Sequence, residues 1–208
     1  AVGYDVLNDN NSGDGANTAV GAAAMELTTS GSWNAALGAS ALRQNTTGSQ
    51  NTALGRSALA NNTTGNQNTA SGVSAMYYNT TGDSNCVFGV EAMKYNVGGK
   101  DNVAVGHSAL SNSNGNFNTA LGFSSLEAIS SGNSNTAIGA LADVSSDMDN
   151  ATAIGFNAIA TQSNMVQLGN NDVTLVRTKG KIIAANEVEI GVGAGGGVTG
   201  GNTAVGYN

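Results

Sequence analysis

Hydrophobic and polar positions along this chain follow a pattern that recurs about every 17 residues. Each unit reads approximately N-T-A-[VLI]-G-x-x-A-[LM]-x-x-N-T-T-G-x-x, and we number its coil positions 1 to 17 from the first Asn. The units begin at Asn17, Asn34, Asn51, Asn68, Asn85, Asn102, Asn118, Asn135 and Ala151, at intervals of 17 or 16 residues. Such regular spacing predicts a solenoid, in which each unit contacts mainly its neighbours.

Two short apolar segments recur in each unit and predict its strands. Position 4 is apolar in every unit except the one that holds Ser71, and position 9 is Leu or Met from Met25 to Leu126. Gly separates the segments and a Thr-Gly or Ser-Gly turn follows, so we expect two strands of about five residues per coil. No helical period is sustained across so many glycines. The predicted fold class is therefore all-β, a flat parallel β-roll. We expect its repeat core at position 4, in Val20, Leu37, Leu54, Val105, Leu121, Ile138 and Ile154.

The Asn at position 1 predicts a ladder of side-chain amides, because an amide can donate to one neighbouring coil and accept from the other. Its members are Asn17, Asn34, Asn51, Asn68, Asn85, Asn102, Asn118 and Asn135. One or two medium-sized apolar side chains per coil bury too little area to offset the entropy lost on ordering the chain. We therefore expect an obligate oligomer, in which small residues at position 3 let chains approach closely. These residues are Ala19, Ala36, Ala53, Ala70, Ala104, Ala120 and Ala137.

Composition and charge narrow the function classes. The chain of 208 residues contains 30 Gly, no Pro and one Cys, and its net charge is −7 with only 7 basic residues. Nucleic-acid binding requires clustered Lys and Arg, so we expect no nucleic-acid partner. The chain contains no apolar run of about 18 residues, so we expect no insertion of this segment into a membrane. Charge is sparse and Val, Leu and Ile recur at fixed places, which favours an ordered repeat over a disordered linker.

No constellation of residues predicts catalysis, a cofactor or a metal site. His107 lies at a position that varies freely among the units, and Cys86 occupies a Thr position, where we expect a small buried residue. The carboxylates fall at different positions of the repeat and form no acid pair of the glycosidase type. The segment GVGAGGG lacks the Lys that follows the glycines of a phosphate loop. We expect this chain not to be an enzyme.

Three groups of side chains leave alternatives open. Asp143, Asp147 and Asp149 form either a solvated turn or a cation-binding turn. The basic cluster at 177–181 serves either interchain ion pairs or contacts with anionic glycan. Several aromatic residues are expected near the outer turns, where they either stack on sugars or pack between chains. The basic residues are Arg177, Lys179 and Lys181, and the aromatic residues are Trp33, Tyr77, Tyr78, Tyr95 and Phe117.

The units NTAVGAAAM and NTALGRSAL resemble the head repeats of YadA-like trimeric autotransporter adhesins, and resemble still more the longer repeats of bacteriophage tail fibres. This resemblance covers residues 1–160 and implies a left-handed parallel β-roll assembled as a homotrimer. The segment 161–183 is similar to the neck-like segments that close such stacks in tail fibres. Residues 184–208 look like the start of a further stack, and AVGYN at their end echoes AVGYD at residues 1–5.

These observations favour a non-catalytic structural segment of a trimeric extracellular or virion fibre that spans distance and supports attachment to a host or surface. Its partners would be further copies of itself and, beyond the segment, a cell-surface glycan or protein receptor. The alternative is a trimeric bacterial surface adhesin whose own roll surface binds host matrix or glycan. A tailspike-type polysaccharide depolymerase is a third and weaker alternative.

Overall fold

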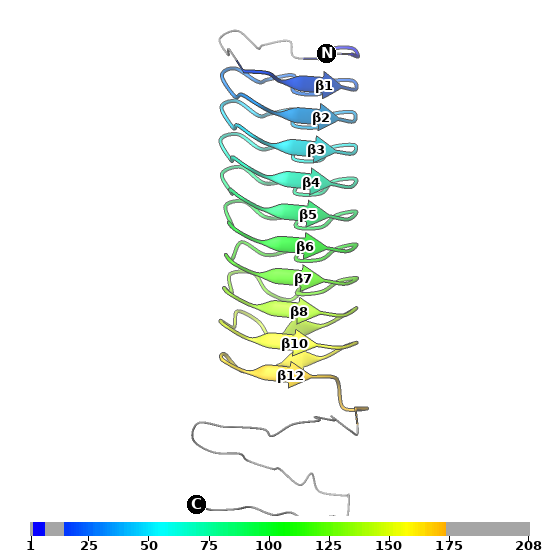
Figure 1. Ribbon diagram of the computed structural model, residues 1–208, viewed down its shortest axis with the longest axis vertical. Coiled ribbons are helices and arrows are strands. Elements are labelled where there is room, and N and C mark those ends of the chain that lie inside the picture. Colours follow the sequence, from blue (N-terminus) through cyan, green and yellow to red (C-terminus); the bar gives the residue numbers. More distant parts are fainter. Residues whose placement is uncertain (1, 7–14, 174–208) are drawn as a thin grey trace, which may run out of the picture. The chain divides into compact units, whose positions relative to one another are not determined.

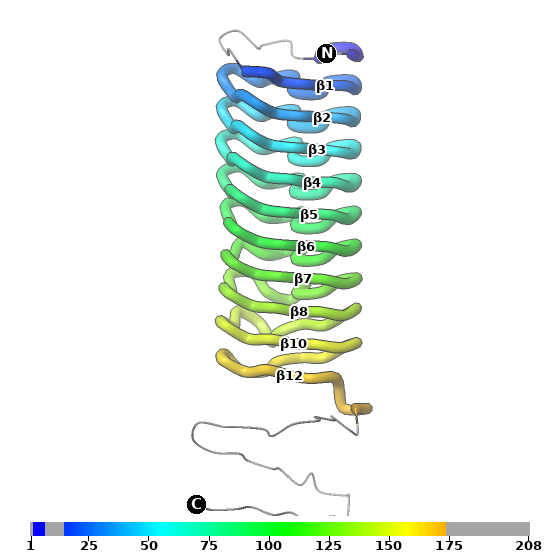
Figure 2. Tube along the Cα trace, viewed as in Figure 1, coloured from blue at the N-terminus to red at the C-terminus, as the bar shows by residue number. Residues whose placement is uncertain are grey.

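The computed structural model describes residues 2–6 and 15–173, which form one column of stacked coils (Figure 1). The described part of the chain is all-β and contains no helix, as the repeat predicts. The chain advances along the column by one coil at a time, and each coil is a flattened loop (Figure 2). The strands are β1 (Thr18–Val20), β2 (Ala35–Leu37), β3 (Thr52–Leu54), β4 (Thr69–Ser71), β5 (Cys86–Phe88), β6 (Val103–Val105), β7 (Thr119–Leu121), β8 (Thr136–Ile138), β9 (Asp143–Val144), β10 (Thr152–Ile154), β11 (Ile159–Ala160) and β12 (Val166–Leu168).

One side of the column is a parallel sheet of 10 strands in the order β1-β2-β3-β4-β5-β6-β7-β8-β10-β12. Neighbouring strands pair so that equal coil positions face each other, as Ala36 faces Ala53 and Leu37 faces Leu54. Position 2 of one coil donates its N–H to the carbonyl of position 1 in the next coil, as Thr52 does to Asn68 at 2.8 Å. Identical side chains therefore stack directly along the column.

The second apolar segment of each unit forms a strand only near the C-terminal end of the stack, in β9 and β11, so the prediction of two strands per coil is wrong for most coils. Positions 7 and 9 have positive φ, for example Ser57 (φ 59°) and Leu59 (φ 51°), and this left-handed geometry interrupts an extended strand. Backbone pairing between coils nevertheless continues there, because Leu59 N–H donates to the carbonyl of Ala75 at 3.0 Å.

The core lies at positions 3, 8 and 9, and this corrects the assignment of the repeat core to position 4. Side chains alternate along the strand, and the Asn of position 1 points inward, so position 3 also faces inward and position 4 faces outward. The coil is thin, and only small residues fit between its walls at position 3. The fully buried residues accordingly include Ala53 at position 3, Ala58 at position 8 and Leu59 at position 9. Of the residues predicted to form the repeat core, Val20, Leu37, Leu54, Leu121, Ile138 and Ile154 are 36% to 54% exposed, and Val105 is half-buried.

The position-3 alanines, expected to face a neighbouring chain, instead line the interior of their own coil. The stack also continues beyond the predicted boundary at residue 160, because β12 pairs with β10 in the same register as the earlier strands. The neck-like segment was predicted to begin at 161, but its first residues still belong to the column. The basic cluster at 177–181 and the predicted further stack at 184–208 lie outside the described residues.

Candidate functional site: polar ladders and an outer apolar row

All eight asparagines of position 1 lie in a continuous ladder. In a typical step, Asn51 Oδ1 accepts the backbone N–H of Asn68 at 2.9 Å, while Asn51 Nδ2 donates to the carbonyl of Gly65 at 2.8 Å. Each side chain thus binds the backbone of the next coil and closes the turn of its own coil. The amide oxygen accepts from a neighbouring coil, as the sequence predicts. The amide nitrogen donates to the turn of its own coil, and in Asn68, Asn85 and Asn102 it also donates to the Asn of the preceding coil, as predicted.

A second amide ladder, not anticipated from the sequence, runs along position 12. Asn62, Asn79 and Asn96 each donate from Nδ2 to Oδ1 of the Asn one coil earlier, with all three distances at 2.7 Å. Asn45 begins this ladder, and all four side chains are fully buried. The signal was present in the recurrent N-T-T-G, but turns favour Asn for local reasons, so the motif was assigned to turn chemistry alone.

Replacing Asn79 by Ala is expected to lower the free energy of unfolding by about 2–4 kcal/mol. The change removes the acceptor of Asn96 Nδ2 and the donor to Asn62 Oδ1, and it leaves both groups buried with fewer partners. Chemical denaturation followed by circular dichroism measures the loss. Gln44→Ala, at an exposed position, is the control and should change stability by less than about 0.5 kcal/mol. Equal effects of the two substitutions would contradict a stabilising role for the ladder.

Thr28 takes the place of Asn at position 12 in the first complete coil, one coil before the ladder begins at Asn45. Thr28 is fully buried, and its Oγ1 is the one buried side-chain polar atom without a hydrogen-bond partner in residues 2–6 and 15–173. An unpaired buried hydroxyl destabilises the fold, because its desolvation is not compensated.

Thr28→Asn should therefore raise the free energy of unfolding by about 1 kcal/mol, because the new amide can accept from Asn45 and donate to the carbonyl of Gly31. Differential scanning calorimetry measures the shift. Thr28→Val serves as the comparison, since it removes the orphan hydroxyl without adding an amide. A Thr28→Asn protein less stable than Thr28→Val would show that the ladder is not extended.

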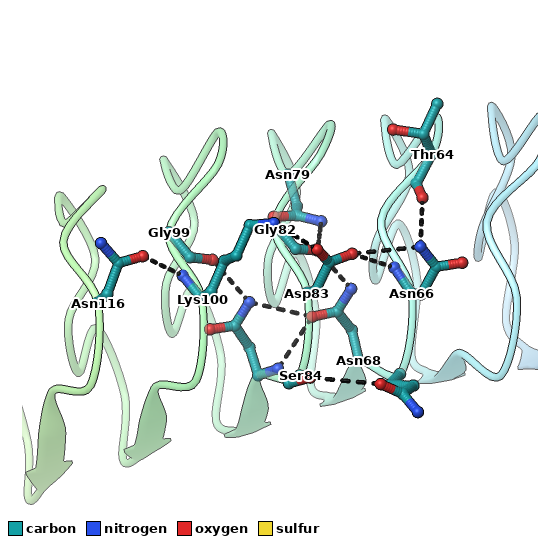
Figure 3. A network of polar contacts seen from close by, with 12 residues as sticks. Thr64, Asn66, Asn68, Asn79, Gly82, Asp83, Ser84, Gly99, Lys100 and Asn116 are labelled. Atoms are coloured by element: carbon teal, nitrogen blue, oxygen red, sulfur yellow. Dashed lines mark hydrogen bonds and ion pairs between the residues drawn. The ribbon is translucent and has the colours of Figure 1, made fainter.

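A third series of polar side chains runs along position 16 on the surface (Figure 3). Asp83 Oδ1 accepts the backbone N–H of Asn66 at 2.8 Å, its Oδ2 lies 2.6 Å from Lys100 Nζ, and the Lys100 N–H donates to Asn116 Oδ1 at 2.9 Å. Partial burial by itself raises the pKa of Asp83, but the hydrogen bonds from Lys100 and Asn66 outweigh it and lower the pKa overall. Such exposed pairs contribute little stability individually. Two further ion pairs are Glu26–Arg43 and Glu91–Lys94.

The three aspartates marked as candidate cation ligands accept hydrogen bonds from preceding coils. Burial raises the pKa of Asp143, whereas backbone hydrogen bonds from Ser131 and Ser130 lower the pKa of Asp147. Within the described ranges no three His, Cys, Asp or Glu side chains are grouped to hold a metal ion. The backbone N–H groups and their acceptors are Ala128 to Asp143 Oδ2 (3.0 Å), Ser130 and Ser131 to Asp147 Oδ1 (both 2.8 Å), and Asn133 to Asp149 Oδ1 (2.7 Å).

A hollow of about 700 Å³ lies near the C-terminal end of the described stack. Its lining includes Asn157, Ile159, Gln167 and Asp172, so that Asp172 is the only carboxylate among the residues that line it. The acid pair that glycoside hydrolysis requires is thus not present in this hollow.

The side chains of position 4 form a row along the outer face of the 10-stranded sheet, which we call the outer apolar row. Cys86 lies on the same face and is exposed, which corrects the expectation that it is buried. His107 is also exposed, and its ring stacks on Phe123 with centroids 5.5 Å apart. The outer apolar row consists of Val20, Leu37, Leu54, Ser71, Phe88, Val105, Leu121, Ile138, Ile154 and Leu168, in which Ser71 is the polar exception.

The aromatic residues near the turns contact each other or solvent. Tyr78 stacks on Tyr95 with centroids 5.4 Å apart, and Tyr77 meets Tyr78 edge-on at 4.6 Å. These contacts cover part of the ring faces that a sugar would use. Trp33 and Phe117 are 64% and 62% exposed and remain candidates for contact with a ligand.

The fold and its ladders define a parallel β-solenoid with about 17 residues per coil. The chain matches no protein-family profile, no curated protein and no solved structure. In residues 2–6 and 15–173 no helix is long and apolar enough to cross a membrane.

Proposed function

We propose that this chain is a structural segment of an elongated homotrimeric fibre, exposed outside a cell or on a virion, that spans distance and supports attachment to a host or surface. The observation that carries the proposal is the outer apolar row, which runs the length of the described stack. Covering this row with further copies of the chain removes it from water and supplies the burial that a thin coil lacks.

The size of the row matches that of a protein interface. Ten strands at a spacing of about 4.8 Å give a row about 43 Å long. Its side chains expose on the order of 700 Å² of apolar surface per chain, which is close to the area that each partner buries in a stable complex. Monomeric proteins rarely expose so large a continuous apolar patch.

The proposed mechanical role follows from the way the coils are joined. Backbone hydrogen bonds and two amide ladders run parallel to the long axis, so that bending the column requires many of them to lengthen together. Sheet edges occur only at the ends of such a stack, which protects its length from unwanted strand pairing.

Analytical ultracentrifugation of the full chain tests the association. At micromolar concentration we expect a sedimenting species of three chains, with a frictional ratio that indicates an elongated particle. A folded monomer under these conditions would contradict the proposal.

A second candidate function is adhesion by the roll surface itself, and the exposed rings of Trp33 and Phe117 favour it, because exposed aromatic residues stack on sugars. Binding of the full chain to a panel of surface glycans separates the two functions. A structural segment should bind none of them, whereas an adhesin should lose binding when Trp33 is replaced by Ala.

A further inference from the structure

The repeat leaves the axial register of an assembly ambiguous. Coils follow one another at about 4.8 Å, and most of them carry an aliphatic residue at position 4. A neighbouring chain that slips by one coil therefore still meets an aliphatic row. A repetitive interface needs at least one layer that differs from the rest, as a single polar residue sets the register of a coiled coil.

One pair of adjacent layers breaks the regularity of the outer apolar row. β4 carries Ser71 at position 4 and β5 carries Phe88, and the two residues are direct partners in the parallel sheet. Ser71 is half-buried, while Phe88 is 44% exposed. The other positions of the row hold Val, Leu or Ile, so its smallest and largest side chains are neighbours.

Size decides how such a pair packs against other chains. A phenyl ring is wider than a layer about 4.8 Å thick unless it lies flat in that layer, so a ring tilted toward the column axis extends into an adjacent layer. Val105 fills the layer on one side of Phe88, and Ser71 leaves space on the other. The excess volume of one layer then compensates the deficit of the next.

We propose that Ser71 and Phe88 form a register key, in which the Phe88 rings of associating copies fill the space that the Ser71 layer leaves. This inference rests on the homotrimer proposed above. In register, the overfilled layer and the underfilled layer are adjacent and compensate each other. After a slip by one coil, Phe88 of one chain faces Val105 of the next, and Ser71 faces Leu54. Between these two layers lies one in which Ser71 faces Phe88 and the volumes balance. This layer separates the overfilled layer from the underfilled one. Both defects then remain, and overpacking and cavities each weaken association. Larger slips lose whole layers of contact.

A double-mutant cycle on the full chain tests the key by sedimentation equilibrium. Ser71→Leu should weaken association at least about tenfold by overpacking against Phe88, and Phe88→Leu should weaken it by a similar factor through the cavity beside Ser71. The double variant has an aliphatic layer at both positions, so its affinity should return to within about threefold of the unmodified chain. Circular dichroism should show the same fold in all variants, because both positions lie on the outer face.

The register itself has a separate readout. Chains that slip leave uncovered apolar layers at their ends, and these recruit further copies. The double leucine variant should therefore sediment as a broad distribution that extends beyond three chains, while the unmodified chain gives one discrete species. The control is Val97→Leu, at an exposed position away from the sheet, which should leave both affinity and homogeneity unchanged.

The outcomes separate the key from the trimer. If the unmodified chain is monomeric, both the proposed trimer and the register key are wrong. If the chain forms trimers but the two single substitutions act additively, complementarity is absent and the key alone is overturned. A double variant as homogeneous as the unmodified chain would also overturn the role of the pair in register.

Discussion

Gly72→Ala should be among the most destabilising single substitutions in this chain, with a loss of at least about 4 kcal/mol in the free energy of unfolding. Gly72 has a φ of +142°, a backbone conformation that residues with a side chain rarely adopt. A Cβ at this position would also lie 2.2 Å from the carbonyl oxygen of Gly89 in the next coil. The new Cβ and the carbonyl oxygen both belong to glycines of position 5, which stack closely on each other. The clash can therefore be relieved only if two coils move apart. Thermal unfolding followed by circular dichroism measures the effect.

Gly98→Ala is the matched control for this prediction. Gly98 lies outside the left-handed region, and a Cβ there would approach only the Thr81 hydroxyl, at 3.2 Å. The substitution should be neutral or stabilising by up to about 1 kcal/mol, because it restricts the unfolded chain. Comparable losses for the two alanine variants would show that contact between coils at position 5 is not the cause.

Leu121→Asp should abolish association, with affinity reduced by at least about a thousandfold. Leu121 lies on β7 in the outer apolar row and is 47% exposed in the single chain. In the proposed trimer, the substitution buries a carboxylate from every copy at one level, and these like charges also repel each other. Sedimentation equilibrium measures the change.

Val97→Asp is the control, because Val97 has almost the same exposure, 48%, but lies at coil position 13, away from the sheet. This variant should remain trimeric. If Leu121→Asp also remained trimeric, the outer apolar row would not be the interface. If it unfolded altogether, the result would fit an obligate trimer, and the weaker Leu121→Ala should then show a measurable rise in the dissociation constant.

The spacing of the repeat was sufficient to predict the solenoid, its coil length and the stacking of equal positions. A fixed period of about 17 residues with Gly at position 5 admits few other folds, and the Asn at position 1 has an amide suited to linking coils. The second ladder at Asn45, Asn62, Asn79 and Asn96 was equally visible as a recurrence, but Asn beside Thr-Thr-Gly has an ordinary explanation in turns.

The tertiary structure alone decided which side of the strand faces inward. Ala53 and Leu54 are neighbours in the sequence, and hydrophobicity favours the larger one for the core. Because the Asn of position 1 points inward and side chains alternate along a strand, position 3 faces inward and position 4 faces outward. The narrow coil accepts only a small residue at position 3. The left-handed backbone at Leu59 could likewise not be predicted from the sequence, because Leu is not a residue type that favours positive φ. The sequence by itself therefore determined the repeat, its period and the position-1 ladder. Which apolar positions are buried and which stay exposed depends on the space inside the coil, which only the three-dimensional path of the chain defines.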